Sequence, residues 1–168
     1  MSLSALEILA ETCGNRLLAR GEMCCCAESC TGGWVAETMT AIAGSSEWFE
    51  RGFVTYSNAA KTDLLGVDAN LIQTQGAVSE AVARAMALGA LANSPADWSL
   101  AITGIAGPGG GSASKPVGTV CFAWAYRHGS SEVQTCHFVG DRAAVRAQSV
   151  KHALSGLLDR LGSSGQIA

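Results

Sequence analysis

The first candidate for chemistry is Ser29, which follows an apolar run and precedes Thr31, Gly32 and Gly33. A serine at a strand-to-helix turn faces solvent, and the N–H groups of the next residues point toward the same space at the helix N-terminus. This arrangement suits a nucleophile beside an oxyanion hole. By itself the motif fits a helix-capping serine in a tight turn better, so the interpretation needs support from elsewhere in the chain.

A serine nucleophile needs a base, and Lys61 is the best candidate. The three histidines fall in a predicted hairpin turn, a strand and the last helix, which disfavours a histidine-based triad. Lys61 lies about one helical turn beyond Tyr56, in a segment that also holds Asn58. Partial burial would lower the pKa of this lysine and let it accept a proton. A solvated lysine on a helix is the alternative, and Tyr56 could equally be a packing residue.

Two further segments could bind a ligand. Residues 103–111 are too rich in glycine for regular structure and lack both the G-K-[ST] ending of a P-loop and a dinucleotide fingerprint. This loop can supply N–H donors or let a ligand approach the backbone, although a merely flexible loop fits its composition equally. Arg142 and Arg146 stand four residues apart, on one face of the last predicted helix. Two guanidinium groups there suit a phosphate, and a surface ion pair is the alternative.

The rest of the sequence predicts the elements that must position these segments. Ser4 and Glu7 form a capping box for an amphipathic helix that Gly21 ends. Strands are predicted at 23–27, 53–56 and 98–102, helices from Gly33 to near Gly44, at 57–65, at 79–91 and after Asp141, and a hairpin at 117–127 and 132–139.

Helices that alternate with parallel-type strands, followed by a terminal hairpin, imply a three-layer α/β/α fold with a mixed sheet of about five strands. In such sheets the ligand crevice lies beyond the carboxyl ends of the strands, where the three candidate loops fall. The sequence contains no linker, repeat or low-complexity block. We therefore expect a single domain over residues 1–168.

Composition narrows the classes of function. The chain has 168 residues, of which 48% are hydrophobic and 15% charged, so it folds and is not disordered. Its uncharged runs are too short for a membrane span, and its N-terminus lacks a secretory signal, which predicts a cytoplasmic protein. A net charge of −3 argues against nucleic acid as a partner. The seven cysteines, three of them consecutive, lack metal-ligand spacing and are expected to be reduced, buried thiols.

Five spaced motifs, taken together, resemble the CinA carboxy-terminal domain family. The resemblance covers nearly the whole chain in the family's order, and the consecutive cysteines stand where larger aliphatic residues are usual in the family. The motifs are Ala27-Glu28-Ser29-Cys30-Thr31-Gly32-Gly33, residues 52–58 with Lys61, residues 103–111, residues 115–120 and residues 138–142.

This resemblance implies a function and a site. Members of the family, which includes competence/damage-inducible proteins, act as nicotinamide-nucleotide amidases in pyridine-nucleotide recycling, and their fold is similar to anticodon-binding domains. Some carry an additional pyrophosphatase-like domain, and this chain resembles the stand-alone amidase. The resemblance makes Ser29 the nucleophile, with Lys61 and Tyr56 as proton-handling partners and no metal or organic cofactor. The substrate-binding candidates are Thr31, Gly32, Gly33, Asn58, Thr103, Gly104, Ala106, Arg142 and Arg146.

Other functions stay open at this point. One alternative is a serine amidase that acts on another small amide. A second is a catalytically silent module that binds pyridine nucleotides, although a pure binder has no need of a nucleophile with a base. We also expect a small nucleotide as substrate, no membrane partner, and assembly as a homo-oligomer.

Overall fold

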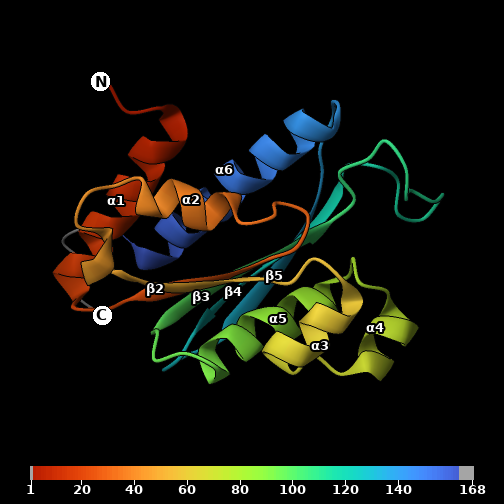
Figure 1. Ribbon diagram of the computed structural model, residues 1–168, viewed down its shortest axis with the longest axis horizontal. Helices are drawn as coiled ribbons and strands as arrows, with labels where there is room; N and C mark the ends of the chain where they lie inside the picture. Colours follow the sequence, from red (N-terminus) through yellow and green to blue (C-terminus); the bar gives the residue numbers. More distant parts are fainter. Residues whose placement is uncertain (1, 163–168) are drawn as a thin grey trace.

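The computed structural model describes residues 2–162, which are built around one mixed sheet with helices on both faces (Figure 1). The sheet has five strands in the order β2-β1-β3-β4-β5. β1 runs parallel to β2 and β3, whereas β4 is antiparallel to both β3 and β5. The strands are β1 (Cys24–Glu28), β2 (Phe49–Val54), β3 (Trp98–Gly104), β4 (Thr119–Tyr126) and β5 (Ser131–His137).

Helices cover the two faces of the sheet as separate layers, and Figure 1 shows α1, α2 and α6 on one side with α3, α4 and α5 on the other. The three-layer α/β/α arrangement predicted from the sequence is therefore confirmed. Among the described residues, no helix is both long and apolar enough to cross a bilayer. The helices are α1 (Ala5–Arg20), α2 (Trp34–Thr40), α3 (Asn58–Leu65), α4 (Ala69–Gln75), α5 (Glu80–Ala92) and α6 (Arg142–Leu161), and a 3₁₀ turn η1 spans Ser45–Glu47.

Short polar side chains begin the helices that carry the site. Ser57 and Asp141 accept hydrogen bonds from the backbone N–H groups of Ala60 and Ala144, so they cap α3 and α6. The predicted capping box of Ser4 and Glu7 is also present at α1. These caps fix where α3 and α6 begin, next to the carboxyl ends of the parallel strands.

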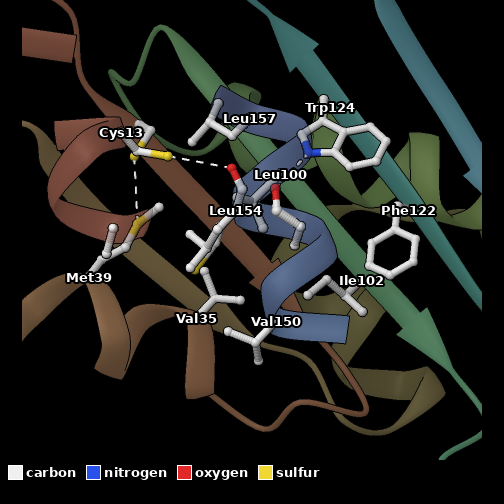
Figure 2. Packing of buried hydrophobic residues seen from close by; sticks show 14 of the residues in the cluster. Cys13, Val35, Met39, Leu100, Ile102, Phe122, Trp124, Val150, Leu154 and Leu157 are labelled. Atoms are coloured by element: carbon white, nitrogen blue, oxygen red, sulfur yellow. Dashed lines mark hydrogen bonds between the residues drawn. The ribbon is translucent and has the colours of Figure 1, made fainter. Parts of the chain in front are cut away.

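The cysteines of β1 divide between the two core layers. Cys24 and Cys26 pack in the cluster shared with α1, α2 and α6, whereas Cys25 packs toward α5. All seven cysteines are free, and six of them are buried, as the sequence predicts. Figure 2 shows the first cluster, in which Trp124 of β4 packs beside Leu154 and Leu157 of α6. β1 is thus buried on both faces, which explains why apolar and polar residues do not alternate along it.

Three elements differ from the expectation. The helix predicted to end near Gly44 is α2, which ends at Thr40. β2 spans Phe49–Val54, four residues earlier than the predicted start, and Tyr56 lies in the loop beyond it. β2 is an edge strand with Arg51 exposed. Because an edge strand tolerates charged residues, the first part of β2 does not form an apolar run. The helix α4 was not predicted, because it has only seven residues and buries only Ile72.

Candidate active site

Ser29 and Lys61 meet at the carboxyl ends of β1 and β2. Ser29 follows β1 directly, and Lys61 lies in the first turn of α3. The Lys61 Nζ atom is 3.0 Å from the Ser29 Oγ atom, although 32 residues separate them in sequence. Ser29 is 8% exposed and Lys61 only 1%. The structure thus brings together the predicted nucleophile and the predicted base, and we call this pair the dyad.

Lys61 is buried beside Ser29 and three backbone carbonyls. Burial lowers the pKa of Lys61. Among the ion pairs of residues 2–162, none involves Lys61. Its Nζ atom lies 2.9 Å from the carbonyl oxygen of Thr55 and 3.3 Å from that of Tyr56. The Nζ atom also donates to the Ser29 Oγ atom and lies 3.5 Å from the carbonyl oxygen of Ser57. When the amine is neutral, its lone pair can accept the proton of Ser29.

Tyr56 contributes to the dyad through its backbone. Its carbonyl oxygen lies 3.3 Å from the Ser29 Oγ atom, whereas its side chain is 62% exposed. The Tyr56 hydroxyl accepts a hydrogen bond of 3.2 Å from Arg142 Nη2. Arg142 also donates through Nη1 to the carbonyl of Gly107, at 2.8 Å. Arg142 of α6 therefore connects the Tyr56 side chain in the β2–α3 loop with the glycine-rich loop.

The turn after β1 is held by Glu28, a residue to which the sequence analysis gave no role. The Glu28 carboxylate is fully buried, and it accepts hydrogen bonds from the Thr31 hydroxyl at 2.7 Å and from the N–H groups of Val35 at 2.8 Å and Ala36 at 3.1 Å. It thereby satisfies the free N–H groups at the start of α2. The signal in the sequence was a carboxylate at the end of an otherwise apolar strand.

Two adjoining cavities lie beside the dyad. The dyad cavity, of about 230 Å³, holds Ser29 and Lys61, and the second, of about 540 Å³, lies at the start of α6 and includes Arg146. Ala106 and Arg142 line both cavities. Of the other predicted substrate-binding residues, Asn58, Thr103 and Gly104 line the dyad cavity, whereas Thr31, Gly32 and Gly33 line neither.

Comparison with known proteins places this fold and site in a family. The profile of the CinA C-terminal domain matches residues 6–161, which is most of the chain. The chain belongs to the CinA C-terminal domain family. The nicotinamide-nucleotide amidohydrolase PncC of Escherichia coli strain K12 is 54% identical over 157 residues, which cover 94% of this CinA domain and 95% of that protein. The PncC of Enterobacter agglomerans is 51% identical over 158 residues, covering 94% of this chain and 96% of that protein.

A solved structure agrees with this assignment. The crystal structure of the competence/damage inducible protein CihA from Agrobacterium tumefaciens matches this CinA domain with a TM-score of 0.92 and 45% sequence identity. The match covers 97% of this chain and 100% of that chain. The two proteins therefore share the whole three-layer fold.

The backbone amides of Cys30 and Ala106 lie in the two loops next to the dyad. The N–H groups of Gly32 and Ile105 donate to the carbonyls of Ser29 and Thr119 and are thus occupied. Cys30 and Ala106 line the dyad cavity, and neither amide nitrogen has an acceptor within residues 2–162. These amides are the candidates for an oxyanion hole.

We expect Glu28→Gln to destabilise the protein by about 1–3 kcal/mol. An amide group keeps one acceptor oxygen but turns an NH₂ toward a donor that now bonds the carboxylate, so at least one buried N–H or hydroxyl group loses its partner. Urea unfolding of the purified variant measures this change. Glu11→Gln, at an exposed position on α1, is the control and should stay within about 0.5 kcal/mol of the wild type. Equal stability of the two variants would contradict the role given to Glu28.

Proposed function

We propose that this CinA domain hydrolyses the carboxamide of nicotinamide mononucleotide to nicotinate mononucleotide and ammonia, a reaction of pyridine-nucleotide recycling. The observation that carries the proposal is the 3.0 Å contact between Ser29 Oγ and the buried amine of Lys61. Its support from outside the chain is the 54% identity to a protein named nicotinamide-nucleotide amidohydrolase. Ser29 and Lys61, which line one cavity, would be the nucleophile and the base of that activity.

The first half of the proposed reaction forms an acyl-enzyme. Ser29 Oγ attacks the carboxamide carbon while Lys61 Nζ takes the hydroxyl proton. The N–H groups of Cys30 and Ala106 stabilise the negative oxygen of the tetrahedral intermediate. The C–N bond then breaks, Lys61 returns the proton to the leaving nitrogen, and ammonia departs. An ester between Ser29 and the pyridine carbonyl remains.

The second half releases the acid. Water attacks the ester carbon while Lys61 again takes a proton, and Ser29 leaves with that proton as the C–O bond breaks. The products are nicotinate mononucleotide and free enzyme. No step of this sequence uses a metal ion or an organic cofactor.

The two cavities suit the two ends of the proposed substrate. The dyad cavity would hold the pyridine carboxamide, with Asn58 and Thr103 in its wall. The second cavity would hold the phosphate on Arg142 and the N-terminus of α6, which line it. Arg146 also lines this cavity, but two of its donor groups bond the carbonyls of Cys30 and Thr31. The shared residues Ala106 and Arg142 then lie beside the ribose that connects the two ends.

Incubation of the purified protein with nicotinamide mononucleotide, followed by liquid chromatography and an ammonia assay, tests the function. We expect nicotinate mononucleotide and ammonia in equal amounts. A panel of other small amides is run in parallel. Turnover of another amide alone would indicate a different serine amidase, and binding without turnover would indicate a catalytically silent module.

We expect Tyr56→Phe to keep kcat within about tenfold of the wild-type value, because Tyr56 contacts Ser29 through its backbone carbonyl, which the substitution retains. Steady-state kinetics with nicotinamide mononucleotide measures the effect. If the Tyr56 hydroxyl instead relays the proton, kcat should fall by about a hundredfold to ten-thousandfold. Tyr56→Leu serves as the comparison, because it removes the aromatic ring as well as the hydroxyl.

Location and assembly complete the proposal. A phosphorylated nucleotide does not cross membranes unaided, so we propose that the enzyme acts in the cytoplasm. We also propose that it forms a homo-oligomer, a state that light scattering of the purified protein would establish.

A further inference from the structure

Arg146 of α6 reaches the turn that carries the nucleophile. Its Nε atom donates to the carbonyl of Cys30 at 3.0 Å, and its Nη2 atom donates to the carbonyl of Thr31 at 3.2 Å. More than a hundred residues separate Arg146 from both partners in sequence. The guanidinium carbon also lies 5.5 Å from the ring centre of Trp34, the first residue of α2. The side chain is therefore fixed on both its edge and its face.

The geometry of this contact restrains the turn as a whole. A planar guanidinium that bonds two successive carbonyls fixes the orientation of both peptide groups, which a single ammonium cannot do. The Cys30 carbonyl belongs to the peptide one step beyond the Ser29–Cys30 peptide, which carries the Cys30 N–H group. Cys30 lines the dyad cavity, and its N–H group has no acceptor within residues 2–162. A rotation of these peptides would move both Ser29 Oγ and the proposed oxyanion donor.

Glu28 and Arg146 hold complementary sides of the same turn. The buried carboxylate of Glu28 accepts from the hydroxyl of Thr31 and from the first N–H groups of α2. Arg146 donates to the carbonyls of Cys30 and Thr31, which a carboxylate cannot bond because it is itself an acceptor. Between them lies Gly32, whose φ of +61° is in the left-handed region, and a Cβ atom there would lie 3.7 Å from Arg146 Nη2. Side-chain charges of both signs thus fix a backbone conformation that the turn needs.

We propose that Arg146 is a positioning residue for the nucleophile, which holds Ser29 Oγ and the Cys30 N–H group in register with Lys61. This inference rests on the proposed role of Ser29. It assigns to Arg146 a function separate from any contact with the phosphate, because two of its donor groups already bond the turn. Arg142, one turn earlier on α6, instead bonds the Tyr56 hydroxyl and the glycine-rich loop and is exposed to the cavities.

Kinetics with two substrates separates positioning from phosphate binding. We expect Arg146→Lys and Arg146→Gln to lower kcat by about tenfold to a hundredfold, the loss typical of a misplacement near 1 Å, with KM nearly unchanged. The loss in kcat/KM should be equal for nicotinamide mononucleotide and for its nucleoside without phosphate. Arg142→Lys is the matched control and should raise KM for the mononucleotide preferentially. A rise in KM for the mononucleotide alone in the Arg146 variants would overturn the inference.

A second measurement needs no nucleotide. The rate at which a fluorophosphonate phosphonylates Ser29 reports the reactivity of the nucleophile, and we expect the Arg146 variants to react more slowly by the same factor as kcat. The lysine of Arg146→Lys can keep a cation near the ring of Trp34. The melting temperature of each variant shows whether it is folded. Labelling of both variants at the wild-type rate would overturn the positioning role. Full amidase activity of Ser29→Ala would instead refute the proposed function.

Discussion

Ser29→Ala is expected to lower kcat for amide hydrolysis by at least about a thousandfold, because the acyl-enzyme cannot form without the serine oxygen. The substitution removes one oxygen from a side chain that is 8% exposed, and Glu28 and Arg146 hold the turn independently of it. Folding should therefore be preserved. Ammonia release under single-turnover conditions, with the melting temperature as a check, measures the effect.

The neighbouring Cys30 provides the control. Cys30→Ala should keep most of the activity, because burial raises the pKa of the Cys30 thiol to about 11 and leaves it protonated at neutral pH. A protonated thiol is a poor nucleophile, and the lysine amine lies against the serine. If Cys30→Ala were the inactive variant and Ser29→Ala the active one, the enzyme would use a thiol, and the proposed mechanism would be wrong.

Much of the fold could be predicted because its strong signals are local. The capping residues Ser4, Ser57 and Asp141 mark the starts of their helices. An apolar run indicates the strand β1. β2 could not be placed correctly, since an edge strand is only partly buried and tolerates charge. α4 has only seven residues, which is too short to show the helical spacing of apolar residues.

The site could be predicted only in part. The sequence identifies residue types that could act in catalysis, but it does not show which distant residues contact one another. Ser29 and Lys61 can be identified as candidates because each follows a predicted strand. The parallel pairing of β1 and β2 then places them side by side. The contact of Arg146 with the turn depends on how α6 packs against α2 and β3, which no local pattern contains. Sequence spacing indicated that Arg142 and Arg146 share a face, and only the structure shows that their guanidinium groups bond different loops.

The second large effect is expected at Lys61. Lys61→Arg and Lys61→Met should each lower kcat by about a hundredfold to ten-thousandfold, the range that general-base catalysis contributes. Arginine keeps hydrogen-bond donors for the carbonyls of Thr55 and Tyr56, but its guanidinium group stays protonated and cannot accept the proton of Ser29. Methionine keeps much of the volume and removes the amine. Steady-state kinetics with nicotinamide mononucleotide measures both variants.

The pH dependence should identify Lys61 as the base. As the pH falls through the pKa of Lys61, the amine becomes protonated, loses its lone pair, and kcat/KM decreases. Since burial lowers this pKa, the acidic limb should lie well below the value of about 10.4 that is ordinary for lysine. A limb at the ordinary value would show that the amine is not perturbed in the free enzyme.

Rescue by small amines distinguishes a base from a fixed charge. In Lys61→Ala the truncated side chain leaves space beside Ser29 Oγ, and a primary amine added to the solution can occupy it. If Lys61 acts as a base, added amines should restore part of kcat, and the acidic limb should move with the pKa of the amine, because only its neutral form accepts a proton. Guanidinium, which stays charged, should restore nothing. If guanidinium rescued the variant, or if Lys61→Arg kept a near-normal kcat, the charge of Lys61 would be its contribution, and the proton of Ser29 would have to pass to Tyr56, a histidine or water.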